Sequence, residues 1–222
     1  MKNKIFSGFI ALVLFLATPA VAQTNQNAAD VIIARGNGFV IQRSQLDEVI
    51  SAIQRASAMT QTVIPPDKLK AIKSETLKRM IQVQILLNMA TDADKATGKV
   101  NADQQLTTML VRAGSPEVFE SKLKAVGMTP EGLRKKLKQE ATATATLTRK
   151  LGVTITDAEA KKYYDDHPEN FTSNGGGLVE FKSAETNIKD TLTLQKVNEL
   201  GPAYLDKLYA AANVQILDAA LK

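Results

Sequence analysis

One histidine and its acidic neighbours come closest, by residue type, to a catalytic or metal-binding group. His167 is the only histidine of the chain, and Asp165, Asp166 and Glu169 lie beside it. An imidazole next to carboxylates could bind a metal ion or act as a general base. A catalytic metal site usually needs three protein ligands that converge in one geometry, which neighbouring residues of one loop do poorly. The pattern therefore favours a structural role for His167 at the end of a helix.

Other chemistries lack their residues. The 222-residue chain has no cysteine, which excludes disulfides, thiol catalysis and cysteine-based zinc sites. It also has no G-x-S-x-G elbow for a serine nucleophile. Gly175-Gly176-Gly177 lacks the flanking strand and the lysine of a phosphate loop, and Gly36-Asn37-Gly38 lacks the third glycine and the following helix start of a dinucleotide fingerprint. We therefore interpret them as a linker and a turn. The sequence predicts no catalytic residue, no cofactor and no metal.

The first residues resemble a secretory signal. Two lysines precede an apolar run from 5 to 17, and Ala20-Val21-Ala22 gives a small-x-small cleavage pattern. The alternative is an uncleaved membrane anchor, but the run is shorter than the roughly 20 residues that a spanning helix needs. We therefore predict a signal peptide over 1–22, a polar, disordered stretch over 23–29, and a periplasmic protein without a membrane span after cleavage.

The charge of the chain is mildly basic. The net charge is +5, and removal of Lys2 and Lys4 with the signal peptide would leave +3. Nucleic-acid-binding proteins usually carry a concentrated basic face, so this balance argues against nucleic acid as a partner. It is compatible with weak attraction to acidic polypeptides.

The two ends of the predicted domain have strand character. Apolar runs flank Gly36-Asn37-Gly38 and predict a hairpin over about 31–41, because Gly and Asn tolerate positive φ. Asn213 precedes a short β-like run over about 214–217. Short hairpin arms cannot stand alone, so we expect the second run to be a third strand beside the hairpin.

Helix signals fill the sequence between these ends. Apolar residues recur at helical spacing, and capping residues, prolines and glycines delimit the runs. We predict seven helical stretches: from Ser44 as N-cap to about 60–64; from Pro66 to about Ala96, stopped by Gly98; from Asn101 to Gly114; from Ser115-Pro116-Glu117 to Gly127; from Thr129-Pro130-Glu131 to Gly152, including the alternating run 141–148; from Thr156 to about Asp165; and from Ser183 to Ala212, kinked or restarted at Gly201-Pro202.

Several of these pieces, in order, resemble the helical domain of SurA-type and PrsA-type chaperones. The stretches that carry the resemblance are VIIARGNGFVIQRSQLDEVI, LKRMIQVQILLNMA, VTITDAEAKKYYDDHPENF and AYLDKLYAAANVQIL, which together span nearly all of Val31 to Leu217. Each motif is weak alone, and their order is the stronger signal. The resemblance implies a mainly α, multi-helix domain over 30–218, closed by a small antiparallel sheet of the hairpin and the C-terminal strand.

The chain departs from the family at one place. Family members resemble one another in carrying a parvulin prolyl-isomerase domain of roughly a hundred residues, with two histidines, after a stretch like TDAEAKKYYDDHPENF. Here only a short linker over 172–181, with the composition TSNGGG at its start, precedes the closing helix. With one histidine and no segment to build that scaffold, the sequence predicts the chaperone domain without the isomerase.

The resemblance implies a protein that holds unfolded polypeptides without ATP, with exported and outer-membrane chains as typical clients. A prolyl isomerase, as in full-length family members, is one alternative. A structural module that forms a swapped homodimer or docks on an exported complex is another. Six residues are candidate client contacts, although packing in the core is the ordinary role of such side chains. They are Met59, Met109, Phe119, Met128, Tyr163 and Tyr164, of which Met59 and Met128 lie nearest to helix ends and are expected to be exposed.

Overall fold

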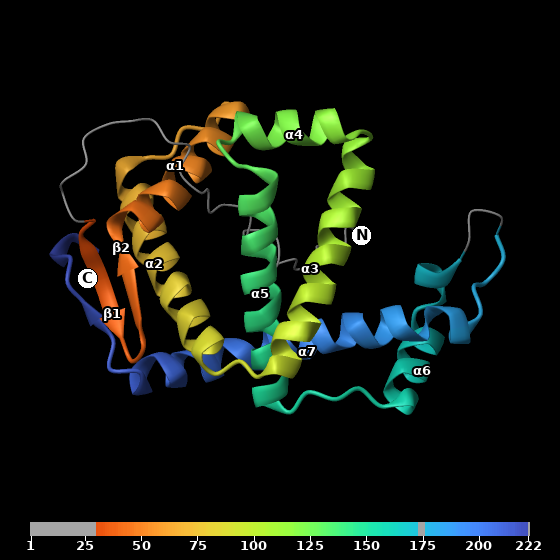
Figure 1. Ribbon diagram of the computed structural model, residues 1–222. Coiled ribbons are helices and arrows are strands. Elements are labelled where there is room, and N and C mark those ends of the chain that lie inside the picture. Colours follow the sequence, from red (N-terminus) through yellow and green to blue (C-terminus); the bar gives the residue numbers. More distant parts are fainter. Residues whose placement is uncertain (1–29, 173–175, 222) are drawn as a thin grey trace. The chain divides into compact units, whose positions relative to one another are not determined.

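The computed structural model describes residues 30–172 and 176–221, and the predicted signal peptide and the stretch 23–29 lie outside them. The chain divides into two compact units. The first unit holds the residues up to Thr146 together with those from Asp206 onward, and the second holds Leu147–Leu205. Figure 1 shows that two helices, α5 and α7, run from one unit into the other. A single domain over 30–218 stays a prediction.

A three-stranded antiparallel sheet joins the two ends of the described chain. Strands β1 (Ile32–Gly36) and β2 (Phe39–Gln42) are connected by a two-residue turn in which Gly38 has a φ of 77°. Strand β3 (Gln215–Ile216) pairs with β1, so the order is β2-β1-β3. The amide of Leu217 donates to the carbonyl of Ile33 at 2.8 Å. The predicted hairpin and third strand are confirmed.

Helices α1 (Arg43–Met59) and α2 (Pro66–Asn88) share an apolar core with this sheet. Their buried side chains repeat at helical spacing, as the sequence predicted. The core of the sheet and the two helices consists of Ile33, Ala34, Ile41, Leu46, Ile50, Leu77, Ile81, Ile85 and Leu221. Because Leu221 lies in the short helix η2 (Ala219–Leu221), the C-terminal segment completes the core of the N-terminal hairpin.

The predicted N-cap of α1 is wrong. Gln42 is the N-cap, and its side chain forms a capping box with Gln45. Ser44 instead lies inside the helix, where its amide donates to the carboxylate of Asp30 at 3.2 Å. Its hydroxyl also donates to the carboxylate of Asp30. Both donors of the predicted cap, Ser44, therefore bond to a residue that precedes the hairpin.

The boundary after α2 also differs from the prediction. Helix α2 ends at Asn88, and α3 (Asp92–Ala113) begins within the stretch predicted to continue α2. Thr91 caps α3, since its hydroxyl accepts from the amide of Asp94 at 3.2 Å and its amide donates to the Asp94 carboxylate at 2.8 Å. The predicted stop at Gly98 and start at Asn101 are therefore wrong, because both residues lie inside α3.

The next two helices follow the predicted punctuation of hydroxyl, proline and acid. Helix α4 (Pro116–Ala125) is capped by Ser115, and α5 (Pro130–Leu151) begins with the amide of Gly132 donating to the Thr129 hydroxyl at 3.0 Å. The alternating Ala-Thr run within α5 is helical, as predicted.

The second unit contains α6 (Asp157–Asp166), the short helix η1 (Pro168–Phe171) and most of α7 (Phe181–Ala211). The predicted Thr156–Glu159 capping box is confirmed. The Glu159 carboxylate accepts from the ammonium of Lys196 at 2.7 Å and from the Thr156 amide, which lowers the pKa of Glu159 to about 2. Helix α7 continues as one helix through Pro202 and does not restart there.

The segment predicted as a linker over 172–181 is short and closed at its base. Thr172 forms an isolated antiparallel bridge with Leu178, and the amide of Val179 donates to the carbonyl of Phe171 at 2.8 Å. The hydroxyl of Tyr164 donates to the carbonyl of Val179. Helix α7 already begins at Phe181, and residues 173–175 lie outside the described chain.

Candidate binding cavity

A close crossing fixes α3 against α5 in the first unit. Gly98 of α3 faces Thr142 of α5 so closely that a Cβ built on the glycine would lie 2.6 Å from the Thr142 amide nitrogen and 2.7 Å from its Cα. One turn away on each helix, the Thr146 hydroxyl lies 3.4 Å from the Asp94 carboxylate. Only glycine permits such an approach of two backbones. From this crossing the two helices diverge toward α4 (Figure 1).

Helix α4 spans the distance between the diverging ends of α3 and α5 (Figure 1). Its C-terminal end is a Schellman turn, with Gly127 at a φ of +73° and the amide of Met128 donating to the Leu123 carbonyl at 2.9 Å. The guanidinium of Arg55, on α1, donates to the carbonyl of Val126 at 2.9 and 3.1 Å. Arg55 therefore ties the corner between α4 and α5 to the first core.

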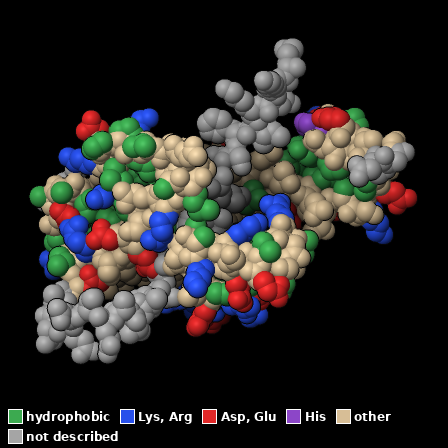
Figure 2. Space-filling view, turned by 90° about the horizontal axis from the view of Figure 1, so that it is seen from above, with side chains coloured by type: hydrophobic (Ala, Val, Ile, Leu, Met, Phe, Trp, Pro, Cys, Tyr) green, Lys and Arg blue, Asp and Glu red, His purple; other side chains and the backbone are tan. Residues whose placement is uncertain are grey.

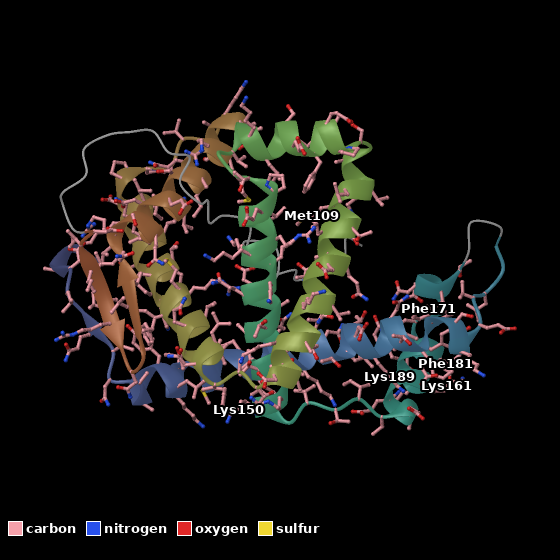
Figure 3. All side chains as sticks on the ribbon, viewed as in Figure 1. Met109, Lys150, Lys161, Phe171, Phe181 and Lys189 are labelled. Carbon is pink, nitrogen blue, oxygen red and sulfur yellow. The ribbon has the colours of Figure 1, made fainter. Side chains whose placement is uncertain are left out.

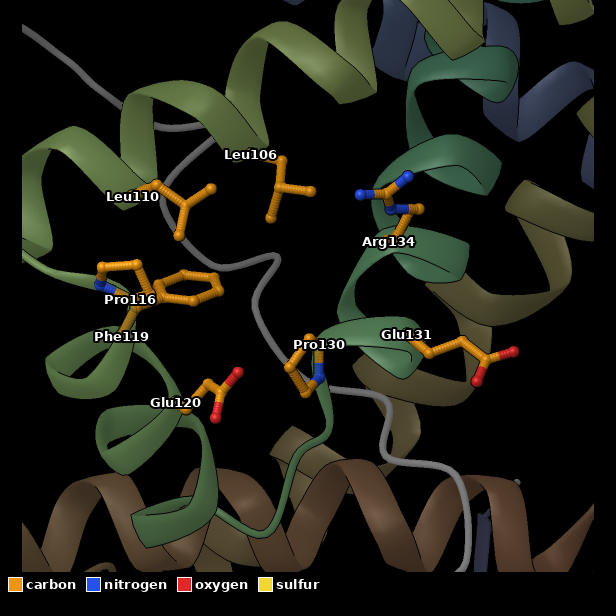
Figure 4. Close-up of a pocket in the computed structure, with 8 residues that line it drawn as sticks. All are labelled: Leu106, Leu110, Pro116, Phe119, Glu120, Pro130, Glu131 and Arg134. Atoms are coloured by element: carbon orange, nitrogen blue, oxygen red, sulfur yellow. The ribbon is translucent and has the colours of Figure 1, made fainter.

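A cavity of about 450 Å³ opens between the three helices. Most of its wall is apolar, and two carboxylates and one guanidinium complete it (Figure 4). Leu106 and Arg134 lie eight residues from Gly98 and Thr142, respectively, which places each about 12 Å along its helix from the crossing. The cavity is thus the space that the divergence of α3 and α5 creates. Its lining residues are Leu106, Leu110, Pro116, Phe119, Glu120, Pro130, Glu131 and Arg134.

A second apolar cluster shares Leu106 and Phe119 with the cavity wall. The ring of Phe119 extends from α4 toward the space between α3 and α5 (Figure 4) and packs in this cluster. Met109, another predicted contact, is half-buried on α3 beside the same cluster (Figure 3). The buried members of the cluster are Ala102, Leu106, Phe119, Leu123, Met128, Leu133, Leu137 and Ala141.

The exposure predicted for the two methionines near helix ends is right for one and wrong for the other. Met59, in the last turn of α1, has 66% of its surface exposed. Met128 has only 5% exposed. It follows the left-handed Gly127 of the Schellman turn, where the chain folds back and packs the residue on Leu123. Met128 therefore packs in the same cluster as Leu106 and Phe119 of the cavity wall, and its side chain is not exposed.

The two predicted tyrosines lie in the second unit, in an aromatic cluster. Tyr164 is buried, its ring 4.9 Å from that of Phe171 and 5.6 Å from that of Phe181. The ammonium of Lys161 lies 5.8 Å from the centroid of the Phe181 ring (Figure 3). Tyr163 is half-buried and stacks on His167 with ring centroids 4.3 Å apart. The contacts of Tyr164 join α6 to η1 and α7, so Tyr164 belongs to the core of that unit, and Tyr163 packs against this core.

His167 occupies the place at the end of a helix that the sequence predicted. It is the C-cap of α6, and its Nδ1 lies 2.9 Å from the carbonyl of Tyr163, to which a protonated Nδ1 donates. Within the described ranges, no group of three His, Asp or Glu residues could hold a metal ion.

Helix α5 carries a buried lysine next to a glutamate one turn along the same helix. Lys136 has only 5% of its surface exposed, and its ammonium is 3.9 Å from the carboxylate of Glu140. Burial lowers the pKa of Lys136 to about 8 and raises that of Glu140 to about 7. Glu48 of α1 and Arg79 of α2 interact electrostatically with Lys136.

Sequence reasoning identified Phe119 as a site residue but missed the charged members of the cavity wall. Glu131 belonged to the predicted helix start Thr129-Pro130-Glu131, whereas Glu120 and Arg134 belonged to no motif. The position of α4 across α3 and α5 places Glu120 at the same cavity as the two charged residues of α5, and no local pattern encodes that position.

The surface of the described chain carries mixed charge. In Figure 2, basic and acidic side chains are interspersed over the visible face, and hydrophobic ones form small groups between them. None of the helices in the described ranges has both the length and the apolar character required to cross a bilayer.

Comparison with known proteins points to one family. A family model described as SurA-like N-terminal domain matches residues 1–147, which include the whole cavity wall. A foldase protein PrsA from Clostridium botulinum is 28% identical over 178 residues, covering 73% of this chain and 53% of the relative. A chaperone SurA from Chromohalobacter salexigens is 24% identical over 172 residues, covering 76% of this chain and 39% of the relative. The chain thus spans about half or less of the length of these relatives.

Proposed function

Because the chain belongs to the SurA-like N-terminal domain family, we propose that it is a chaperone that holds unfolded polypeptides in the cavity between α3, α4 and α5. The names of the relatives, foldase and chaperone, support a role in protein folding. The observation that carries the proposal is the apolar cavity within the matched region. The clients we propose are exported and outer-membrane proteins.

The cavity suits loose binding of side chains. Its volume lies in the range of sites that enclose small molecules, roughly 300–1,000 Å³, so it can take a few side chains of an extended segment. Burial of one large apolar side chain contributes about 1.5–3 kcal/mol before the cost of ordering the segment. Leucine, proline and phenylalanine walls impose little hydrogen-bond geometry, and binding of this kind tolerates many sequences.

Two further parts of the proposal rest on sequence patterns. We propose that holding does not use ATP, as the resemblance to SurA-type and PrsA-type chaperones implies, and Gly175-Gly176-Gly177 lacks the lysine of a phosphate loop. We propose export to the periplasm from the signal-like pattern over 1–22. Expression in a Gram-negative host tests export: the chain is expected in the periplasmic fraction, and retention in the cytoplasm would contradict it.

Catalysis is outside the proposal. The alternative, prolyl isomerisation, would place its reaction near His167, whose ring stacks on Tyr163 and caps α6. Turnover of a proline peptide that is lost in His167→Ala would establish the alternative. A homodimer is the other alternative, and sedimentation at several concentrations measures it directly.

A matched pair of variants tests the cavity. Leu110 lines the cavity, whereas its neighbour Val111, on the same helix, has 76% of its surface exposed. Light scattering of an unfolded outer-membrane protein measures how well each variant prevents aggregation. Leu110→Gln is expected to reduce suppression several-fold, because it puts an amide into the apolar wall, while Val111→Gln should match the unchanged protein. Equal suppression by both variants, with equal helix content by circular dichroism, would contradict the proposal.

A further inference from the structure

The two carboxylates of the cavity wall have no charged partner. Within residues 30–172 and 176–221, neither Glu120 nor Glu131 forms an ion pair. Lys124 follows Glu120 at the i,i+4 spacing that favours pairing on a helix, yet the two do not pair. Figure 4 shows the Glu120 side chain extending from α4 toward Pro130. These negative charges are therefore available to a bound segment.

Some acidic residues of the same unit are paired, whereas others, such as Glu75 on α2, form no ion pair within the described residues. On α3, Asp92 accepts from Lys95 at 2.9 Å and Asp103 from Lys99 at 3.1 Å. The basic residue of the wall, Arg134, does not pair with Glu131 either, although it follows Glu131 by three residues. The cavity wall thus carries two negative charges and one positive charge.

We propose that the cavity selects client segments in which lysine or arginine flanks the apolar residue that enters it, with Glu120 and Glu131 as the specificity-determining residues. The inference rests on the proposed function, since it assigns a preference to the same cavity. The wall has a net charge of −1 while the chain as a whole is positive. Apolar contacts supply most of the affinity, and the carboxylates distinguish basic from acidic flanks.

The size of the effect follows from the exposure of Glu120, Glu131 and Arg134 to solvent. A solvent-accessible ion pair contributes little, so each carboxylate should change affinity by about 1.4- to fivefold. Arg134 repels the same basic flank, and removal of its charge should therefore strengthen binding. The preference should weaken as salt rises, because the Debye length falls from about 10 Å at 0.1 M to about 3 Å at 1 M.

Two fluorescent peptides test the preference. Both carry a central Leu-Phe-Leu, flanked by lysines in one and by glutamates in the other, and fluorescence anisotropy gives their affinities for the full chain. The lysine-flanked peptide should bind more tightly. Glu120→Gln should lower its affinity by about 1.4- to fivefold, and Arg134→Gln should raise it by a similar factor. Glu75→Gln, at an exposed site on α2, is the matched control and should leave the affinity unchanged.

The outcomes separate the preference from the binding itself. If neither peptide binds, the proposed function fails. If both bind equally, or the glutamate-flanked peptide binds more tightly, binding stands and the charge preference is overturned. Self-association of the chain in sedimentation that Glu120→Gln abolishes would assign the cavity to a second copy and would also overturn the inference.

Discussion

The crossing of α3 and α5 gives the sharpest prediction for a single substitution, Gly98→Ala. An added Cβ would lie 2.6 and 2.7 Å from backbone atoms of Thr142, closer than carbon atoms approach without movement. Since a backbone cannot rotate away as a side chain can, α3 and α5 must separate at this point. Overpacking of this kind costs about 1–3 kcal/mol, and we expect the upper part of that range.

The helix propensity of alanine offsets part of this cost. Alanine stabilises a helix interior by about 0.8–1.0 kcal/mol relative to glycine. The net loss for Gly98→Ala is therefore about 1–2 kcal/mol of unfolding free energy, equivalent to roughly 2–8 °C in Tm for a chain of this size. Gly201→Ala is the control, because beyond its chain neighbours the added Cβ would meet only a methyl of Leu147 at 3.4 Å. The following Pro202 disfavours a Cβ at this helical position and offsets the propensity of alanine, so this variant should lose less stability than Gly98→Ala.

Thermal unfolding followed by circular dichroism at 222 nm compares the two variants directly. A Gly98→Ala protein whose Tm equals or exceeds that of the unchanged chain would refute the close crossing. It would also contradict the continuous course of α3 through Gly98, where the sequence predicted a helix end.

Three other predictions concern charge and cooperativity. Replacement of the buried pair by Lys136→Met with Glu140→Leu should leave unfolding free energy unchanged or raise it by up to about 4 kcal/mol in urea titrations. Because the folded pKa of Glu140 is raised to about 7 from 4.5, its contribution to stability should decline as pH rises from about 4.5 to 7. The double variant should lose that decline, and an unchanged pH profile would contradict the shift. The pKa of Glu159 is lowered to about 2, so its contribution is present above pH 4.5 and lost as pH falls toward 2. Lys196→Ala should reduce that acid-side dependence in a circular dichroism titration, whereas an identical titration would argue against the ion pair. Calorimetry should show one transition for 30–218, because α5 and α7 run through both compact units, and two resolved transitions would disprove the single domain.

The sequence predicted elements whose signals are local. The Ser115-Pro116 and Thr129-Pro130 starts located α4 and α5, and the Thr156 capping box located α6. Glycine and asparagine in the turn located the hairpin. In each case, a few adjacent residues satisfy the free backbone groups at the end of the element, so that a short stretch of sequence is enough.

The errors arose where a residue serves a distant contact. Gly98 resembled a helix stop, but it lies within α3 because Thr142 of α5 leaves no room for a side chain. The local signal for the true boundary, the capping box of Thr91 and Asp94, is present in the sequence. Ser44 resembled an N-cap, but its amide and its hydroxyl both donate to the carboxylate of Asp30.

The candidate site shows the same division. Phe119 was a predicted contact and lines the cavity, whereas Met128 was expected to be exposed and is buried by the turn after α4. The three charged residues of the wall come from two helices, and Glu120 lines the same cavity as Glu131 and Arg134 only because α4 bridges the diverging ends of α3 and α5. Arg55 of α1 fixes that bridge, across 71 positions of sequence, and no local pattern could predict it.

The most direct test of the cavity as the binding site uses the absence of tryptophan from the chain. Leu110→Trp places a single fluorophore in the cavity wall, and Met59→Trp places one on the exposed end of α1, itself a predicted client contact. Each variant is titrated with an unfolded client that contains no tryptophan. Binding in the cavity predicts a blue shift and a saturating intensity change at position 110 and none at 59. A response at 59 without one at 110 would contradict the cavity as the site where this chaperone domain holds its clients.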